Sequence, residues 1–202
     1  MKWQGFALLA GLSIALLSGC GAPSSTTGGN AYQTTGSSNS TTSTANQTAA
    51  TASPAAAIGH MAPNFDLAQL GGTGNVSLSK LLANGEPILL NAWASWCPPC
   101  QMETPDLIKM SQKYKGQMQF VGVDMTTQET NPKDASAFVK KYGIPYSVLM
   151  DTQGTFLNAY ALQGFPTTFV ISPKGKILDV EFGMMTAERM QTVIQQAIAA
   201  SK

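Results

Sequence analysis

The stretch from Leu89 to Pro105, LLNAWASWCPPCQMETP, constrains the fold of this chain more than any other part of it. It begins as an apolar run that fits a buried strand, breaks at the Cys97-Pro98-Pro99-Cys100 tetrapeptide, and continues in a pattern typical of a helix. Proline is tolerated in the first turn of a helix, because its missing N–H would have no intrahelical partner there. The stretch therefore predicts a strand-to-helix turn with Cys97 at the N-terminus of the helix.

The spacing of the two cysteines indicates redox chemistry. Cys97 and Cys100 are three positions apart, so their sulfurs can meet within one helical turn. The free N–H groups and the dipole at a helix N-terminus favour a thiolate over a thiol. A thiolate is the species that attacks disulfides, so the pair is expected to act as a dithiol/disulfide couple.

Composition excludes two other classes of function. The chain has 12 Lys and Arg residues, 11 Asp and Glu residues and a formal net charge of +1, and it has no basic patch that would favour nucleic acid. Of its three cysteines only Cys97 and Cys100 fall in the predicted domain, and there is one histidine, His60. A structural zinc site usually needs four such ligands, so we expect neither a metal site nor a nucleic-acid partner.

The first 57 residues are predicted to export and tether the domain. Residues 1–19 combine the positive Lys2 with an apolar segment too short for a comfortable membrane span. They lead into Leu17-Ser18-Gly19-Cys20, which resembles the bacterial lipobox, where the cysteine is lipidated and becomes the first residue of the mature protein. The alternatives are an ordinary signal peptide with a chance cysteine, or an uncleaved anchor. All three place the domain outside the cytoplasm.

Residues 20–57 read as a linker between that anchor and the domain. They consist almost entirely of Gly, Ala, Ser, Thr, Asn, Gln and Pro, which supply too little apolar surface to offset the entropy of ordering. We expect a flexible tether with a reach of about 30–35 Å. The folded domain is then expected over residues 58–202.

Periodicity predicts alternating strands and helices across that domain. Ser79 is expected to cap a short helix, and Asn131 to cap another whose first helical residue is Pro132. Strands are expected at 76–78, 87–94, 118–125, 145–150, 167–172 and 177–182, and helices at 79–82, 98–114, 132–142, 155–162 and from 186. A βαβ core followed by a β-hairpin and a final helix predicts an α/β fold with a mixed sheet.

Four stretches resemble the thioredoxin superfamily and, within it, the exported thiol-disulfide oxidoreductases of the TlpA/ResA type. The resemblance covers about residues 58–200 and implies a thioredoxin-like fold. In that fold a central mixed β-sheet is flanked by helices on both faces, with extra N-terminal strands and a βα insertion. The redox-active Cys97–Cys100 disulfide then needs no organic cofactor. The matching stretches are Ala62-Pro63-Asn64-Phe65, residues 91–100, Glu103 with Pro105, and Gly164-Phe165-Pro166-Thr167-Thr168-Phe169.

The resemblance also implies a substrate groove. Pro166 would be the cis-proline of the fold, lying across from Cys97; the alternative is a trans proline that starts a strand. Backbone at Phe165 would pair with an extended substrate segment. Trp93 is expected in the core, and Trp96 as a lid over the dithiol. The groove is expected to comprise Trp96, Pro98, Pro99, Phe165 and Pro166.

Glu103 is the candidate for handling the proton of Cys100. Thioredoxin has a buried aspartate where this chain has Asn91, which cannot take a proton; the TlpA/ResA type commonly has asparagine there. Glu103 lies three residues after Cys100 and shares its helix face. A partly buried carboxylate with a raised pKa would act as a base toward Cys100. The alternative is a solvated glutamate that only favours the helix dipole.

Together these features predict a membrane-tethered oxidoreductase in which Cys97 attacks a disulfide and Cys100 resolves the mixed disulfide. The resemblance implies exported protein substrates, such as apocytochrome c during cytochrome c biogenesis, and a transmembrane thiol reductase as electron donor. A disulfide-donating oxidant would share every residue and differ only in redox potential.

Two further classes fit the residues less well. A peroxiredoxin-like peroxidase needs Thr or Ser three residues before its cysteine, where this chain has Ala94. A copper chaperone of the related assembly-factor type needs Cys-x-x-x-Cys and a downstream histidine, and His60 precedes the motif.

Overall fold

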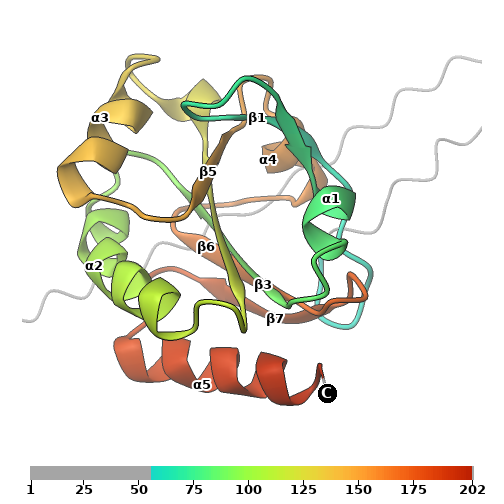
Figure 1. Cartoon of the computed structure of the whole chain (residues 1–202). Coiled ribbons are helices and arrows are strands. Elements are labelled where there is room, and N and C mark those ends of the chain that lie inside the picture. Colours follow the sequence, from blue (N-terminus) through green and yellow to red (C-terminus); the bar gives the residue numbers. More distant parts are fainter. Residues whose placement is uncertain (1–55, 202) are drawn as a thin grey trace, which may run out of the picture. The chain divides into compact units, whose positions relative to one another are not determined.

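A computed structural model of the chain describes residues 56–201. The expected signal peptide, the lipidated Cys20 and nearly all of the expected tether lie outside the described residues. Figure 1 shows the described elements. In chain order they are β1 (Asp66–Gln69), β2 (Asn75–Ser77), α1 (Leu78–Leu82), β3 (Ile88–Trp93), α2 (Pro98–Lys113), β4 (Gln119–Asp124), the 3₁₀ helix η1 (Thr126–Gln128), α3 (Asp134–Tyr142), β5 (Ser147–Met150), α4 (Thr155–Ala159), β6 (Thr167–Ile171), β7 (Ile177–Phe182) and α5 (Ala187–Ala199).

The strands form one seven-stranded sheet in the order β2-β1-β5-β4-β3-β6-β7. Strand β3 is parallel to β4 and antiparallel to β6, and β4 is parallel to β5. The hairpin of β1 and β2 joins the sheet antiparallel to β5, and β7 pairs antiparallel with β6. The predicted mixed α/β sheet is therefore confirmed, and β3, which leads into the cysteine motif, lies inside the sheet with all its residues buried.

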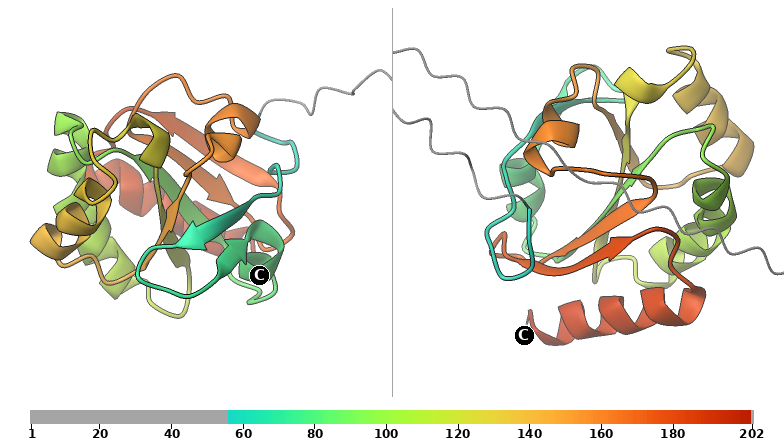
Figure 2. Two further views of the ribbon diagram at one scale, coloured as in Figure 1. Left: turned by 90° about the horizontal axis from the view of Figure 1, so that it is seen from above. Right: turned by 180° about the vertical axis from the view of Figure 1, so that it is seen from behind.

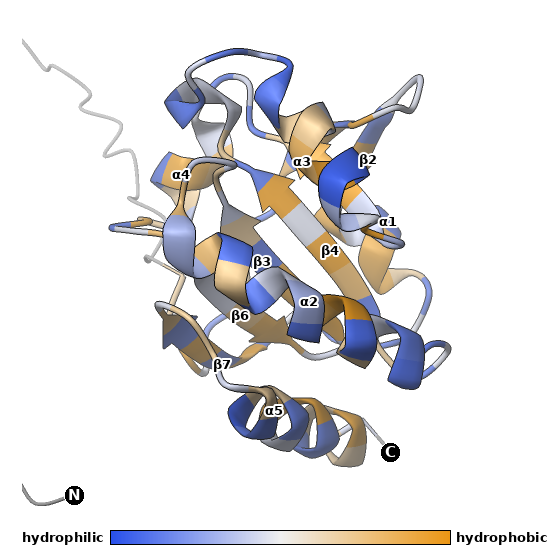
Figure 3. Ribbon diagram, turned by 90° about the vertical axis from the view of Figure 1, so that its left-hand side faces the viewer, coloured by the Kyte–Doolittle hydropathy of each residue, from blue (hydrophilic) through white to orange (hydrophobic). Residues whose placement is uncertain are grey.

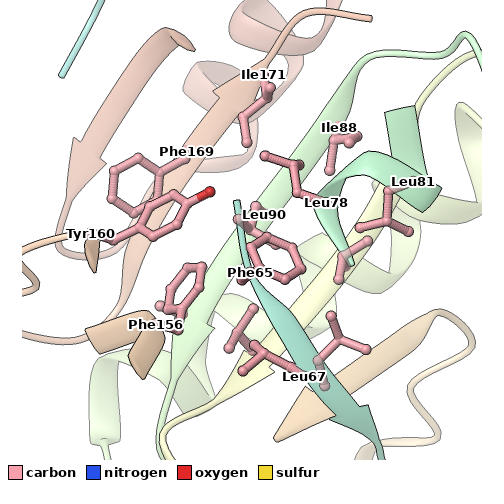
Figure 4. Close-up of a cluster of buried hydrophobic side chains, with 14 of the residues drawn as sticks. Phe65, Leu67, Leu78, Leu81, Ile88, Leu90, Phe156, Tyr160, Phe169 and Ile171 are labelled. Carbon is pink, nitrogen blue, oxygen red and sulfur yellow. The ribbon is translucent and has the colours of Figure 1, made fainter. Parts of the chain in front are cut away.

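Helices cover both faces of the sheet, as Figures 1 and 2 show. Side chains of β3 point alternately to the two faces. Ile88 and Leu90 belong to the cluster drawn in Figure 4, which joins α1 and α4 to the sheet. Leu89 belongs instead to a cluster with Leu107 of α2 and Met190 of α5. Figure 3 shows the matching hydropathy: β4 is largely hydrophobic, whereas α2 and α5 carry both hydrophobic and hydrophilic residues.

Trp93, at the end of β3, is a core residue, as the sequence predicts. It lies in a third cluster with both cysteines of the motif, and its ring stacks on Phe138 of α3 with centroids 4.5 Å apart. Gly122 of β4 makes room for the indole, because a Cβ at that position would lie 2.9 Å from Nε1 of Trp93. This packing fixes β3, β4 and α3 against one another directly below the motif.

Two predicted helix starts are wrong. The N-cap of α1 is Ser77, whose side chain accepts the N–H of Lys80, and Ser79 lies inside the helix. Helix α3 begins at Asp134. The Asn131 side chain accepts the N–H of Lys133 within a turn that precedes α3, and the carboxylate of Asp134 accepts the N–H of Asn131. Such local side-chain bonds compete with helix formation, so the helix starts later than the proline suggested.

Within residues 56–201, no helix combines the length and the apolar character needed to cross a membrane.

Candidate active site

The turn between β3 and α2 holds a disulfide. Cys97 is the N-cap of α2, with Pro98 and Pro99 in its first turn, and its Sγ is bonded to that of Cys100 at 2.09 Å. The N–H of Cys100 also points at Cys97 Sγ, at 3.2 Å. Both cysteines are buried, each 2% exposed. The predicted strand-to-helix turn and the position of Cys97 are confirmed, so the sulfur sits where helix N–H groups favour a thiolate once the bond is reduced.

Glu103 lies one helical turn after Cys100 and is 1% exposed. One carboxylate oxygen accepts the N–H of Met185 at 3.1 Å, and the other accepts Nδ2 of Asn91 at 3.5 Å. Burial raises the pKa of Glu103 from 4.5 to about 7, although these two hydrogen bonds act in the opposite direction. A solvated first-turn glutamate is thereby excluded, and the carboxyl can take or release a proton near neutral pH.

Asn91 links this carboxyl to the neighbouring strand. Its Nδ2 donates to Oγ1 of Thr168 at 2.9 Å as well as to Glu103. Asn91 of β3 lies directly opposite Thr168 of β6 in the sheet. The amide cannot hold the proton, but it orients the group that can. Sequence reasoning missed Thr168 and Met185 as partners; Thr168 lies within a recognised motif, whereas nothing in the sequence singles out Met185.

Pro166 precedes β6, and the Phe165–Pro166 peptide bond is cis, in agreement with the resemblance. Pro166 is buried, and its carbonyl accepts the N–H of Gly183 at 2.8 Å. Phe165 packs against the buried cluster that contains both cysteines. The ring of Trp96 meets that of Phe165 edge-on, with centroids 6.2 Å apart, and Trp96 is 50% exposed. Pro98 is exposed and Pro99 half-buried on the same turn.

Exposed apolar side chains gather in the segments next to the disulfide. Met102 follows the motif on α2, and Phe182 and Met184 flank Gly183 in the segment between β7 and α5. This segment is held at the site by the bond from Gly183 to the cis-proline and the bond from Met185 to Glu103. We call Trp96, Met102, Phe182 and Met184 the apolar rim. Residues 94–102 and 182–187, which carry it, include no charged side chain.

Comparison with known proteins identifies the family. The AhpC/TSA family matches residues 58–180, which is more than half of the chain. The thioredoxin-like protein YneN of Bacillus subtilis is 37% identical over 134 residues, covering 66% of this chain and 76% of that protein. The thiol-disulfide oxidoreductase ResA of Bacillus subtilis is 35% identical over 130 residues, covering 63% of this chain and 69% of that protein. The chain belongs to the AhpC/TSA family. It is a ResA-like thiol-disulfide oxidoreductase.

Solved structures agree with this assignment. A putative thiol:disulfide interchange protein DsbE from Chlorobium tepidum superimposes with a TM-score of 0.63 at 31% identity, covering 70% of this chain and 98% of that one. StoA from Bacillus subtilis superimposes with a TM-score of 0.57 at 26% identity, covering 65% of this chain and 96% of that one. The ResA-like oxidoreductase therefore has the thioredoxin-like fold expected from its sequence, with Cys97–Cys100 as its active-site disulfide.

Two other features bear on the chemistry of this ResA-like site. Ala94, where a peroxidase would need a hydroxyl, is fully buried at the start of the turn, directly after β3. Among residues 56–201, no group of three or more His, Cys, Asp or Glu side chains is arranged to hold a metal ion. The active-site pair of this oxidoreductase is Cys97 and Cys100.

Proposed function

We propose that this chain is a membrane-tethered, extracytoplasmic reductant of disulfides in exported proteins. The observation that carries the proposal is the Cys97–Cys100 disulfide at the start of α2 with Glu103 buried one turn away. Cys97 is the attacking sulfur, Cys100 the resolving sulfur, and Glu103 the group that takes the proton of Cys100. Relatives named thiol-disulfide oxidoreductase ResA support thiol–disulfide exchange at this cysteine pair.

In the first step the thiolate of Cys97 attacks one sulfur of the substrate disulfide. A bond forms between Cys97 and that sulfur, and the substrate's other sulfur leaves as a thiolate that takes a proton from solvent. Helix N–H groups stabilise the attacking thiolate, because Cys97 is the N-cap of α2.

In the second step Cys100 closes the protein disulfide. Its thiol gives a proton to the Glu103 carboxylate, and the resulting thiolate attacks Cys97 Sγ. The second substrate sulfur leaves and is protonated, with Glu103 returning the proton. The substrate thus gains two electrons and two protons, and the protein is left with its disulfide. A carboxyl whose pKa is about 7 suits this role, since it accepts and releases a proton at neutral pH.

The surroundings of the disulfide favour a polypeptide substrate. The apolar rim offers exposed, uncharged contact area on the segments that adjoin the active-site turn. Among the described residues, the main-chain groups of Phe165 have no backbone hydrogen-bond partner, which leaves them free to pair with an extended segment beside the cis-proline. Apocytochrome c, which presents a Cys-x-x-Cys-His segment, is a substrate of this kind. A transmembrane thiol reductase would then return the electrons.

Membrane attachment is proposed from the sequence of the N-terminal segment. Lipidation at Cys20 would hold the domain at the outer side of the cell membrane, within reach of both exported substrates and the electron donor. Cell fractionation of the Cys20→Ser variant tests this part. The variant is expected to leave the membrane fraction, and an unchanged membrane fraction would contradict lipidation at Cys20.

Trapping the intermediate tests the chemical roles. A Cys100→Ser variant mixed with an oxidised Cys-x-x-Cys-His peptide is expected to accumulate a mixed disulfide at Cys97, whereas Cys97→Ser should accumulate none. Glu103→Gln should form the mixed disulfide at the normal rate but resolve it about tenfold or more slowly, since general base catalysis typically contributes 10²–10⁴-fold. Glu188→Gln, on the first turn of α5, is the matched control and should behave as wild type. Trapping at Cys100 instead of Cys97 would contradict the assignment.

A further inference from the structure

A second pair of carboxyl groups, Asp124 and Glu129, lies next to the active-site turn and has no part in the mechanism above. Asp124 is the last residue of β4, and Glu129 follows the short helix η1. The main chain brings this segment to the end of β3, because the N–H of Met125 donates to the carbonyl of Trp93 at 2.9 Å. The segment thus runs beside the residues that lead into Cys97.

Three hydrogen bonds join the segment to that turn. The Glu129 carboxylate accepts the N–H of Ser95 at 2.5 Å with one oxygen and the hydroxyl of Ser95 at 2.6 Å with the other. The indole N–H of Trp96 donates to the carbonyl of Gln128 at 2.7 Å. Hydrogen bonds to an ionised carboxylate are short and strong, and accepting two of them fixes direction as well as distance. Glu129 therefore holds Ser95, two residues before the attacking sulfur.

From its other side Ser95 is tied to α2. Its carbonyl accepts Nε2 of Gln101 at 2.8 Å, and the N–H of Cys97 donates to the carbonyl of Ala94 at 3.2 Å. The position of Cys97 thus depends on a turn whose middle residue is bonded both to the β4–α3 segment and to the helix. Loss of the two Glu129 bonds would leave one of the three bonds, from Trp96 to Gln128, between that turn and the segment.

The carboxyl of Asp124 interacts with that of Glu129. Asp124 is 0% exposed, and its Oδ2 accepts the hydroxyl of Thr126 at 2.6 Å, whereas Oδ1 has no hydrogen-bond partner among the described residues. Burial, together with the facing carboxylate of Glu129 and the charge of Asp134 on α3, raises the pKa of Asp124 to about 7. Two adjacent carboxyls hold one proton more readily than two charges. A protonated Asp124 could donate from Oδ1 to the carboxylate of Glu129.

We propose that Asp124 and Glu129 form a carboxyl clasp that positions the turn presenting Cys97 for thiol–disulfide exchange. Glu129 is the positioning residue and Asp124 supports it. This inference rests on the proposed function only in taking Cys97 as the attacking sulfur. It adds a second role for carboxyl groups at this site. Glu103 transfers a proton, whereas the clasp keeps the turn that presents Cys97 in position.

The test measures the second-order rate at which the reduced full-length protein reacts with a cystine-bridged peptide whose cysteines are flanked by apolar residues. Glu129→Ala is expected to lower this rate by about tenfold, since small misplacements of a reacting group are costly in rate. Ser95→Ala, which keeps its N–H, should lower it less. The double variant should be no slower than Glu129→Ala alone, because both changes remove one interaction. Glu86→Ala, before the opposite end of β3, is the matched control.

Two substitutions of Asp124 distinguish a loss of positioning from a loss of folding. At a pH below 7, Asp124→Asn retains a donor to Glu129 and should react at the wild-type rate, whereas Asp124→Ala should react as slowly as Glu129→Ala. All variants are compared at a temperature where circular dichroism shows them folded. A wild-type rate for Glu129→Ala, or a double variant slowed by the product of the single effects, would overturn the clasp. Failure of the wild-type protein itself to react through Cys97 would instead overturn the proposed function.

Discussion

Glu103 should make the folded protein less stable as the pH rises. In the folded chain burial raises the pKa of Glu103 from its ordinary value of 4.5 to about 7. Between these values the folded state binds a proton that the unfolded state has released, so the free energy of unfolding falls with increasing pH. The contribution of Glu103 to the free energy of unfolding is fully present below pH 4.5 and is lost as the pH rises through about 7. Because one pH unit corresponds to about 1.36 kcal/mol, this interval amounts to roughly 3 kcal/mol.

Glu103→Gln removes the titrating group and should flatten the pH profile of stability by about 3 kcal/mol. The assay is urea unfolding of the oxidised protein, followed by circular dichroism between about pH 4 and pH 8, where a constant m-value shows that only stability changes. Oxidised protein is used because the cysteines in the disulfide do not titrate. The pKa of Asp124 is also raised to about 7, so the free energy of unfolding of the variant should still fall with increasing pH because of Asp124.

Glu188→Gln is the control for this experiment, since the exposed Glu188 lies at the start of α5 and should leave the wild-type profile unchanged. The reasoning is refuted if Glu103→Gln shows the same loss of stability between pH 4.5 and about 7 as the wild type. In that event the buried carboxyl would not be protonated in the folded state, and its role as a base toward Cys100 would lose its physical basis.

Three further substitutions test the packing around the site. Gly122→Ala places a Cβ 2.9 Å from Nε1 of Trp93, so it should destabilise the fold by about 1–3 kcal/mol and shift the indole emission; unchanged thermal unfolding would contradict this packing. Asp151→Ala leaves the N–H of Leu157, which donates to it at 2.9 Å, without its acceptor and should lower the free energy of unfolding in urea by about 1–3 kcal/mol. Arg189→Ala breaks two partly exposed ion pairs with β7. Because exposed ion pairs contribute little, the free energy of unfolding in urea should fall by less than about 1 kcal/mol, and a larger fall would contradict this reasoning.

The parts of the site that depend on local sequence could be predicted. An apolar strand, a Cys-Pro-Pro-Cys turn and an amphipathic helix follow one another without a gap, so the position of Cys97 at the helix N-terminus needs no long-range information. The shared helix face of Cys100 and Glu103 follows from their spacing in the same way. The helix start at Asp134 was missed because Asn131 and Pro132 are typical of both a cap and a turn, and local hydrogen bonds decide between them.

Contacts between distant segments could not be predicted. Met185 is 82 residues from Glu103 in the chain, and Glu129 is 34 residues from Ser95. Hydrophobic periodicity indicates which side chains are buried, but it does not indicate which buried polar groups will meet. Asp124 falls within the strand expected at 118–125, but nothing in the sequence indicates that the fold buries its carboxyl next to Glu129.

The direction of electron flow is the central claim that remains to be measured, and the reduction potential of the Cys97–Cys100 couple tests it most directly. The full-length protein would be equilibrated across a series of thiol/disulfide buffers, and the fraction of free thiol at the two cysteines determined by alkylation and peptide mass spectrometry. The proposed reductant predicts a potential near or below about −230 mV, toward that of thioredoxin. A potential near about −120 mV, that of a strong disulfide donor, would contradict the proposal and make the protein an oxidant.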